Sequence, residues 1–424
     1  MKEFEMDFAN HPCFSEGARH KFGRIHLPVA PKCNIQCNYC NRDFDCLNES
    51  RPGVTSQVLT PQQAVAYLGA VLKKIGNISV VGIAGPGDPF ANGFETMETL
   101  RLVREQYPEM LLCVATNGLE ILPYVDELAR LKISHVTVTV NTLDPVIGGQ
   151  IYNWARLNGR MYRGAEAAQV ILARQLEAIR KLKEKGIVVK INTVVIPGIN
   201  DQKVADLAQH MSVLEADIMN CMPLYHVAGT ALEAVTPPSA ELMTQLRETA
   251  AIHLPQMSHC GRCRADAAGM IGQQNIEEIT ALLKDASQAW GSATRPSVAV
   301  ASMEGIFVNQ HLGEAAALWI FGLEKGAATL IDRRSTPPAG SGTDRWTAMA
   351  ELLHDCNTVL VGGIGRNPQR VLERAGIRVV AMEGLAAEGV EAVLQGREIP
   401  KILLHLPGRC GVGKGCRGTG VGCG

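Results

Sequence analysis

The sequence predicts an α/β protein built from two units, a larger one with six strand–helix repeats and a smaller one after it. Strand-like and helix-like segments alternate from about residue 24 to 225, which favours parallel strands joined by right-handed crossovers. A stretch rich in turn-forming residues, WGSATRPS at 290–297, separates this region from a second, shorter alternation. The length of 424 residues agrees with two or three domains.

Each repeat of the first region pairs an apolar run with an amphipathic segment. The first strand, GRIHLPVA, leads into a cysteine-rich loop, and the next helix has Thr60 as its N-cap and Pro61 in its first position. The remaining segments are ISVVGIAG, GFETMETLRLVREQYP, MLLCVATNG, a helix near 121–131, HVTVTVN, AAQVILARQLEAIRKLKEKG, IVVKINTVVIPG, a helix near 201–214 and DIMNCMPLY. A further helix, PSAELMTQLRETAAIH, and the helical stretch NIEEITALLKDAS follow the sixth strand.

The second alternation predicts a small α/β unit that starts at SVAVAS. Its GGIGRNP sequence (362–368) is similar to a dinucleotide-binding glycine pattern, but Pro368 occupies the last position, so we interpret it as a tight strand-to-helix turn. The last 17 residues contain Cys410, Cys416 and Cys423 at irregular spacing, which favours a flexible tail over an iron-scavenging one. We therefore expect five segments: an N-terminal segment (1–23), the repeat region with its CGRC extension (24–288), a linker (289–297), the small unit (298–407) and the tail (408–424).

Composition and charge exclude several classes of function. The net charge of −1 provides no electrostatic basis for binding nucleic acid or an anionic membrane. No apolar run reaches the ~18 residues of a membrane span, and the N-terminus lacks the apolar core of a signal peptide. We therefore expect a cytoplasmic protein with no nucleic-acid or membrane partner. In that reducing compartment, thirteen cysteines indicate metal binding rather than disulfides.

Three of these cysteines, Cys33, Cys37 and Cys40, form a CxxxCxxC pattern in the loop after the first strand. Three thiolates hold three irons of a [4Fe–4S] cluster, and the fourth iron then stays open to a small molecule. Clusters that only carry electrons normally have four cysteine ligands, so this arrangement indicates chemistry at the cluster. The alternative is a zinc knuckle, although structural zinc sites favour paired CxxC motifs and four ligands.

The triplet, together with Tyr39 before its third cysteine, resembles the radical S-adenosylmethionine (SAM) superfamily. The resemblance implies a partial (β/α)6 barrel and catalytic cysteines whose cluster binds SAM at the open iron and cleaves it to a 5′-deoxyadenosyl radical. It also implies that the glycine-rich turn GIAGPGDP binds the methionine amino group in the Gly85–Asp88 region. A plain strand-to-helix turn is the alternative for that segment.

Polar residues recur near the ends of the later strands, where an apolar core would be expected. They are Asn117 in ATNG, Thr139 and Asn141 in VTVN, and Asn192 with Ile196 in INTVVIPG. Side chains alternate along a strand, so Thr137, Thr139 and Asn141 share one face. Buried polar groups need hydrogen-bonding partners, and the ribose, carboxylate and adenine of SAM are suitable ones. A satisfied structural network remains the alternative.

Further potential ligands flank the triplet. His26 lies in the first strand, and Cys13 and Cys46 lie before and after the triplet. Cys113 lies in the third strand, and Cys260 and Cys263 form the CxxC motif of CGRC. Taken singly, the isolated cysteines suit small buried hydrophobic residues and His26 suits a hydrogen-bonded core histidine. The CxxC motif indicates metal binding more strongly.

The run HPCFSEGARHKFGRIHLPVAPKCNIQCNYCNRDFDCLNESRPGVTS resembles the NifB family, radical SAM proteins that build the core of the nitrogenase cofactor. The similarity continues through GIAGPGDP, ATNG, VTVN and CGRC, over about residues 11–270. The resemblance implies three [4Fe–4S] clusters: the SAM cluster and two substrate clusters. Its ligand sets map onto Cys13, His26 and Cys113 for one substrate cluster, and onto Cys46, Cys260 and Cys263 for the other.

The same resemblance implies a reaction and its partners. Two clusters would be fused into an eight-iron core that contains a SAM-derived carbide and an added sulfur, and iron–sulfur donor and cofactor-carrier proteins would be partners. The small C-terminal unit resembles the NifX and NafY carriers, with His311 and Glu314 in VNQHLGEA as candidate contacts. Two other functions remain open: a radical SAM maturase of another substrate with auxiliary clusters, and a non-catalytic iron–sulfur scaffold.

Overall fold

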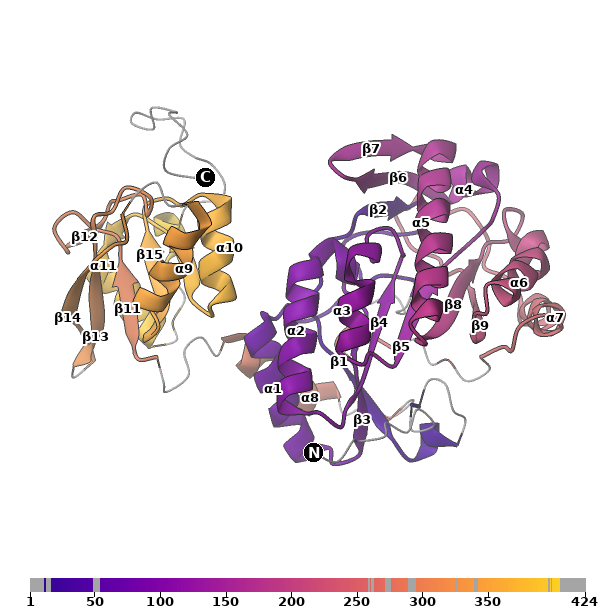
Figure 1. Ribbon diagram of the computed structural model, residues 1–424, viewed down its shortest axis with the longest axis horizontal. Helices are drawn as coiled ribbons and strands as arrows, with labels where there is room; N and C mark the ends of the chain where they lie inside the picture. Colours follow the sequence, from indigo (N-terminus) through magenta and orange to yellow (C-terminus); the bar gives the residue numbers. More distant parts are fainter. Residues whose placement is uncertain are drawn as a thin grey trace. The chain divides into compact units, whose positions relative to one another are not determined.

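The computed structural model describes residues 11–12, 17–48, 54–257, 260, 263–270, 276–288, 295–324, 326–338, 342–395, 397 and 399–404 (Figure 1). The chain divides into two compact units, residues 1–287 and 288–424. Cys13, Cys410, Cys416 and Cys423, and most of the expected linker, lie outside the described residues. Within the part of the chain that is described, no helix is long and apolar enough to cross a membrane.

The first unit is built on one seven-stranded sheet with the strand order β10-β1-β3-β4-β5-β8-β9. Six of its strands are parallel to their neighbours: β1 (Gly23–His26), β3 (Ile78–Ile83), β4 (Leu111–Thr116), β5 (His135–Thr139), β8 (Val188–Val195) and β9 (Ile218–Pro223). The short β10 (Ala268–Gly269) pairs antiparallel with β1. This arrangement confirms the predicted α/β fold with a partial (β/α)6 barrel.

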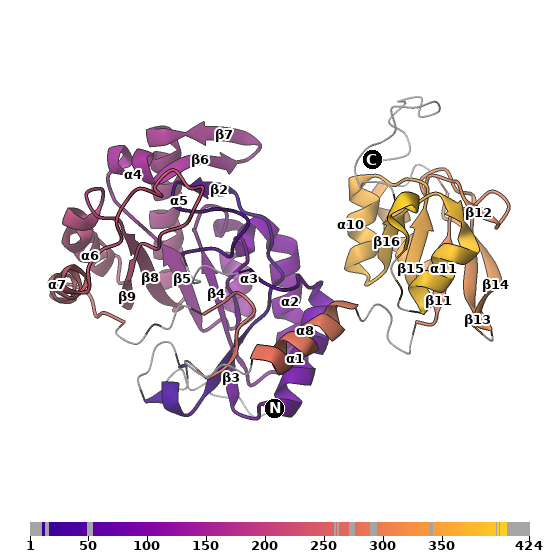
Figure 2. The ribbon, with the colours of Figure 1, turned by 180° about the vertical axis from the view of Figure 1, so that it is seen from behind.

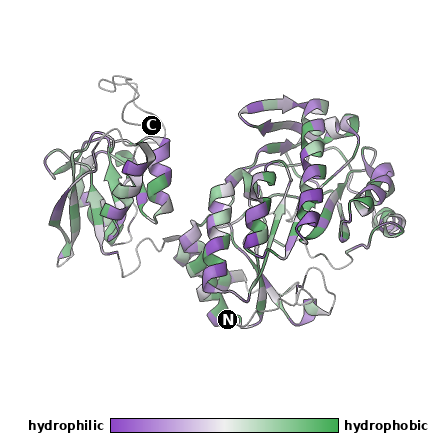
Figure 3. Ribbon diagram, in the orientation of Figure 1, coloured by the Kyte–Doolittle hydropathy of each residue, from purple (hydrophilic) through white to green (hydrophobic). Residues whose placement is uncertain are grey.

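Helices lie along the sheet of the first unit and bury their apolar faces against it (Figures 1 and 2). They are α1 (Pro61–Lys74), α2 (Gly93–Gln106), α3 (Val125–Arg130), α5 (Gly164–Glu184), α6 (Val204–Val213), α7 (Ala240–Ala251) and α8 (Ile276–Gln288). The short α4 (Pro145–Ile151) instead packs Ile151 into the apolar cluster that includes Cys37 and Tyr39. The predicted start of α1 is confirmed, because Thr60 and Gln63 form a reciprocal capping box. Along the helices, polar and apolar residues alternate, as expected when one face meets the sheet (Figure 3).

A three-stranded sheet that the sequence analysis missed supports the cysteine loop. Its strands are β2 (Ile35–Cys37), β6 (Tyr152–Leu157) and β7 (Arg160–Arg163). Asn158 and Gly159 join β6 to β7 with φ values of 50° and 79°. Both residues tolerate positive φ, so this dipeptide was the signal for a hairpin. Cys37 pairs with Tyr152 across the small sheet, which fixes the backbone of the cysteine loop.

The second unit has a five-stranded sheet with the order β14-β13-β11-β15-β16. Its elements are β11 (Ser297–Val300), β12 (Phe307–Val308), β13 (Ala317–Glu324), β14 (Ala327–Ser335), α9 (Gly342–Leu352), β15 (Cys356–Val361), α10 (Arg366–Arg374), β16 (Arg378–Ala381), β17 (Gly384–Leu385) and α11 (Ala386–Leu394). Separate apolar clusters form on its two faces. The GGIGRNP segment joins β15 to α10 as the predicted strand-to-helix turn.

Candidate functional site

The two faces of the first unit's main sheet differ in chemistry. On β5, Val136 and Val138 belong to the core packed under the helices, whereas His135 and Thr139 do not. The same alternation runs through β8, where Val189 faces the helix-packed core. The face turned away from that core therefore carries the polar side chains on which any function of the barrel depends.

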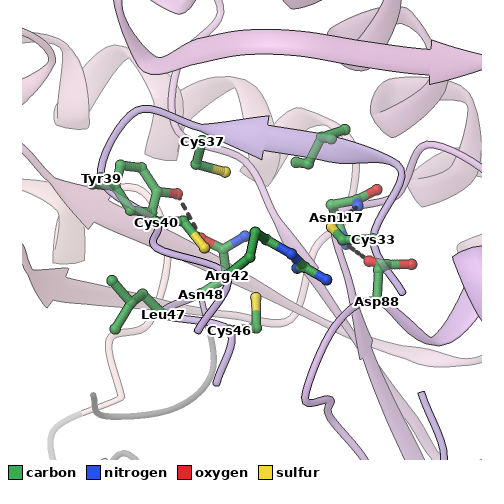
Figure 4. A pocket seen from close by; sticks show the side chains of 11 residues that line it. Cys33, Cys37, Tyr39, Cys40, Arg42, Cys46, Leu47, Asn48, Asp88 and Asn117 are labelled. Atoms are coloured by element: carbon green, nitrogen blue, oxygen red, sulfur yellow. Dashed lines mark hydrogen bonds between the residues drawn. The ribbon is translucent and has the colours of Figure 1, made fainter. Parts of the chain in front are cut away.

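The triplet loop forms a buried pocket beside the strand ends (Figure 4). The structure brings a fourth thiol, Cys46, to the three of Cys33, Cys37 and Cys40, and Figure 4 shows the Arg42 side chain running between them. The other residues that line the pocket are Ile35, Tyr39, Leu47, Asn48, Asp88 and Asn117.

Burial sets the protonation of these thiols in the metal-free chain. It raises the pKa of Cys33 to about 12, with the Asp88 carboxylate as the next cause, and it also raises the pKa values of Cys37, Cys40 and Cys46. A thiol must lose its proton to bind iron, so cluster binding here releases protons. The donor set suits an iron–sulfur cluster, whose positive irons stabilise the thiolates.

The glycine-rich turn lies against the cysteine loop. The backbone N–H of Gly87 donates to the Ala30 carbonyl at 2.6 Å, and that of Asp88 donates to the Lys32 carbonyl at 2.8 Å. A Cβ on Gly87 would lie 2.1 Å from the Lys32 oxygen, so only glycine permits this approach. Gly85, with φ of +147°, accepts a hydrogen bond from the Ala30 N–H. The predicted Gly85–Asp88 segment therefore lies beside the triplet.

Asp88 links the triplet loop to the end of β4. Its carboxylate accepts hydrogen bonds from the backbone N–H of Asn117 at 2.6 Å and from the hydroxyl of Thr116 at 3.0 Å. Burial raises the pKa of Asp88, while these donors oppose the shift. The Asn117 amide in turn donates to Asn34 at 2.7 Å and lies 3.8 Å from the sulfur of Cys33.

Two more of the predicted polar positions, Asn141 and Asn192, have protein partners. The Asn141 amide donates to the hydroxyls of Tyr39 and Tyr152 at 2.9 and 3.2 Å. The Asn192 amide donates to the Asn48 carbonyl at 2.7 Å, while Ile196 belongs to the apolar cluster that includes Cys37 and Tyr39. Asn141 and Asn192 thus participate in a hydrogen-bond network that holds the cysteine loop against the barrel.

Thr139 differs from these neighbours. It is buried, and its side-chain oxygen has no hydrogen-bond partner among the described residues. A buried hydroxyl left unbonded costs free energy, so this oxygen is suited to a polar ligand. The residues at these strand ends therefore fit a SAM molecule bound beside the triplet.

A second set of donors lies deeper in the barrel. In the strand register, His26 on β1 pairs with Gly82 on β3, and Gly82 pairs with Cys113 on β4. Gly82 leaves room between them: a Cβ there would lie 2.9 Å from the Cys113 sulfur and 3.1 Å from the His26 ring. Mainly because of burial, the pKa of His26 is lowered to about 4, which favours the neutral ring that binds metals. The structure thus brings His26 and Cys113 together around a cradle that a side chain would fill.

The N-terminal segment reaches the same region. His11 is buried, and its ring centre lies 4.3 Å from that of His135 on β5. His135 is the register partner of Cys113. His11 therefore lies beside the pair of strands that holds Cys113, whereas Cys13 lies outside the described residues.

The CGRC segment also meets this end of the barrel. The Arg24 side chain donates to the Cys263 sulfur at 2.8 and 3.2 Å, and His26 Nδ1 lies 3.0 Å from the Arg264 carbonyl oxygen. Cys46 lines the triplet pocket instead, and the structure does not place it in contact with the described Cys260 and Cys263. The two segments are joined close by, where the N–H of Ala265, two residues after Cys263, donates to Asp45, one residue before Cys46, at 3.4 Å.

The described residues do not form an ordinary single-ion site. Among them, no three His, Cys, Asp or Glu side chains converge closely enough to hold one metal ion. A structural zinc ion takes four ligands in one tetrahedron, an arrangement that these described residues do not form. The corners of a four-iron cluster are farther apart than the ligands of one ion.

In the second unit, His311 and Glu314 occupy one turn. The backbone N–H of Gly313 donates to His311 Nδ1 at 3.1 Å, and that of Glu314 donates to the His311 carbonyl at 2.9 Å. Glu314 is exposed, and the His311 ring lies against Gly363. The turn lies just beyond the end of β15, where the Gly362 N–H donates to the Gln310 carbonyl and the Leu312 N–H donates to the Gly363 carbonyl, at 2.9 Å each.

Each of the two units matches a known protein family. Residues 27–211 match the radical SAM superfamily, and residues 295–396 match the dinitrogenase iron-molybdenum cofactor family. The FeMo cofactor biosynthesis protein NifB of Chlorobaculum tepidum is 52% identical over 99% of both chains. The protein of the same name from Klebsiella pneumoniae is 44% identical over 87% of this chain and 86% of its own.

Solved structures are more distant. The SAM-bound structure of Streptococcus suis SuiB matches with a TM-score of 0.41 and 15% identity, covering 56% of this chain and 50% of its own.

Proposed function

This chain belongs to the NifB family of radical SAM proteins of FeMo cofactor biosynthesis, and from that premise we propose a specific reaction for it. The chain fuses two [4Fe–4S] substrate clusters and inserts a SAM-derived carbide and a further sulfur, which yields the eight-iron core precursor of the nitrogenase cofactor. It thus acts as a carbide synthase with methyl-transfer and lyase steps, and it uses three clusters in all.

One observation carries the proposal: a single barrel holds two donor sets at two levels. Asn117, beside the triplet pocket, lies four residues after Cys113 on the same chain segment. At ~3.3 Å per residue, the two levels are roughly 13 Å apart. Cysteine and histidine at the deeper level suit iron and sulfide, and an organic substrate would not need them.

The upper level would hold the cofactors. Cys33, Cys37 and Cys40 would bind the cluster that, with SAM, supplies a methyl group and a hydrogen-abstracting radical. Gly85 to Asp88 would position the methionine end of SAM, and the hydroxyl of Thr139 would bond to a polar SAM atom. The remaining polar positions, Asn117, Asn141 and Asn192, would keep the loop and strand ends in place, and Ile196 would pack beside them.

The substrate clusters would lie below the triplet and beside it. One, at the deeper level, would use Cys13, His26 and Cys113, and the other would use Cys260 and Cys263 together with Cys46, which lines the triplet pocket. Imidazole is a neutral ligand and binds iron in sulfide-rich sites less tightly than thiolate does, so His26 would favour release of its cluster. Donor proteins would deliver the clusters, a carrier protein would accept the product, and the second unit would hold it through His311 and Glu314.

Anaerobic reconstitution with iron and sulfide tests this function. The reconstituted chain, given SAM and reductant but no peptide, is expected to form both 5′-deoxyadenosine and S-adenosylhomocysteine. A non-catalytic scaffold would form neither product, and a peptide maturase would not form both from clusters alone. Replacing Cys33, Cys37 and Cys40 by alanine should abolish both products while the other iron remains bound.

A further inference from the structure

The deeper level of the barrel carries basic side chains beyond the proposed cluster ligands. The register runs from His26 through Gly82 and Cys113 to His135, so these four positions lie side by side on consecutive strands. Lys190 on β8 pairs with Thr137, two residues beyond His135. It therefore lies one step nearer to the strand ends.

These basic groups lie inside the unit rather than on its surface. His135 is 2% exposed, Lys190 is 6% exposed and His11 is 1% exposed. Their neighbours Val136 and Val189 pack under the helices, so His135 and Lys190 occupy the opposite face, where His26 and Cys113 lie. Side chains from four strands (β1, β4, β5 and β8) and His11 thus converge on one interior volume.

Lys190 lies close enough to influence the imidazoles around it. Its charge lowers the pKa values of His11, His26 and His135, although burial is the larger cause for each. Arg24 also lowers the pKa of His26, whereas Asp266 raises it. Asp266 already accepts hydrogen bonds from Nε and Nη2 of Arg264, at 2.8 Å each. The net charge of the side chains around His26 and His135 is therefore positive, which suits a bound group that is rich in electrons.

We propose that Lys190 and His135, with His11 packed on His135, form a basic seat that holds the iron–sulfur substrate carried by His26 and Cys113. The ammonium and imidazole N–H groups would donate to the cluster's sulfides and compensate the negative charge that it gains on reduction. The two residues are positioning residues and not iron ligands. This inference rests on the proposed function, because it assumes a cluster at His26 and Cys113.

Because Lys190 lies nearer to the strand ends than His135 does, it would also orient the cluster held in the seat. Thr137 and Lys190 lie between the row of His26, Cys113 and His135 and the row of Thr139 and Asn192. A sulfide held by the Lys190 ammonium would be turned toward the SAM-binding strand ends. The seat would therefore fix which face of the cluster meets the methyl group.

The test uses the full chain, with Cys33, Cys37, Cys40 and Cys263 replaced by alanine so that the His26–Cys113 cluster is observed alone. Lys190→Met and His135→Leu are compared in this background, with Lys203→Met as the control that removes an exposed lysine of the same unit. Chelator titration measures how tightly iron is held, and a redox titration followed by electron paramagnetic resonance measures the cluster's midpoint potential.

Loss of a supporting hydrogen bond or charge is expected to weaken iron retention by about 10- to 100-fold. Lys190→Met should also shift the midpoint potential to more negative values, because the reduced cluster loses a compensating charge. Lys190→Arg should restore the potential, which separates a charge effect from a general packing defect. Thermal unfolding of each metal-free variant checks that the fold is kept.

Two outcomes would overturn the inference, and they are distinguishable from failure of the proposed function. If Lys190→Met and His135→Leu retain iron and potential as wild type does, there is no seat. If Lys190→Arg fails to restore the potential, the charge of Lys190 is not what the cluster uses. If His26→Ala and Cys113→Ala also retain the cluster, the proposed cluster site itself is wrong.

Discussion

Gly82 is the position at which one added methyl group tests the deeper site most directly. In Gly82→Ala, the new Cβ would lie 2.9 Å from the Cys113 sulfur and 3.1 Å from the His26 ring. Favourable non-bonded contacts between carbon atoms begin at roughly 3.5 Å, so both side chains must retreat by about half an ångström. Metal–ligand distances tolerate only about 0.2 Å, so this displacement would disturb both proposed ligands at once.

The expected effects on stability and on cluster binding differ in size. Overpacking costs about 1–3 kcal/mol of unfolding free energy, and the stiffer unfolded chain offsets about 0.4–1 kcal/mol of it. The metal-free variant should therefore remain folded. Misplacement of the ligands should weaken iron binding at this site by about 10- to 100-fold, as loss of a supporting partner does.

The assay is iron and sulfide content per chain after anaerobic reconstitution, with thermal unfolding of the metal-free protein measured alongside. Gly76→Ala is the matched control, because a Cβ there meets nothing within 4 Å. A Gly82→Ala protein that binds as much iron as wild type, with equal resistance to chelators, would refute the assignment of a cluster to this cradle.

Three further predictions follow from the same geometry. Thr139→Val keeps the shape of the side chain but removes the hydroxyl that lacks a partner among the described residues. The dissociation constant for SAM, measured by calorimetry on the reconstituted protein, should therefore rise about fivefold, equivalent to ~1 kcal/mol. Unchanged affinity would mean that SAM does not use this oxygen. His26→Cys should slow release of the iron–sulfur product to an acceptor, because thiolate holds iron more tightly than imidazole, and release as fast as in wild type would count against that role. In the second unit, Arg334 donates to both oxygens of Asp355 at 2.6 and 2.8 Å and lowers the pKa of Asp355 from 3.8 to about 2. The pair therefore stabilises the fold fully above pH 3.8, and this stabilisation is lost as the pH falls through about 2. Asp355→Asn should therefore lower the unfolding free energy at pH 7 by less than ~1 kcal/mol, since the pair is partly exposed, and the difference from wild type should vanish in acid denaturation curves below pH 2.

The sequence predicted the barrel because its signals are local. Thr60 and Pro61 mark the start of α1, and the apolar runs of the six parallel strands stand out between helices. The hairpin of β6 and β7 was missed because its strands are short and partly exposed, although Asn158–Gly159 marked its turn. Such strands depend on pairing with β2, a contact that local patterns do not reveal.

The site was harder to predict from the sequence than the barrel, because it depends on which strands are neighbours in the sheet. Asn141 and Asn192 were predicted to contact SAM; their amides donate to the Tyr39 hydroxyl and the Asn48 carbonyl, and contact with SAM stays a prediction. His135 and Lys190, which the proposed seat uses, were not singled out, since an isolated histidine or lysine in a strand carries no local signal. The register pairs His135 with Cys113, and Lys190 with Thr137 two residues farther along β5.

The central claim is that carbon from SAM enters an iron–sulfur product assembled in this barrel. The most direct measurement uses SAM labelled in its methyl carbon, followed by separation of the iron–sulfur product from the protein under anaerobic conditions. We expect the label to be recovered with the iron–sulfur product, and to disappear from that product in Cys113→Ala, in which one substrate cluster loses a ligand. Label found only in small organic products or on the polypeptide, with none in the iron–sulfur fraction, would contradict it.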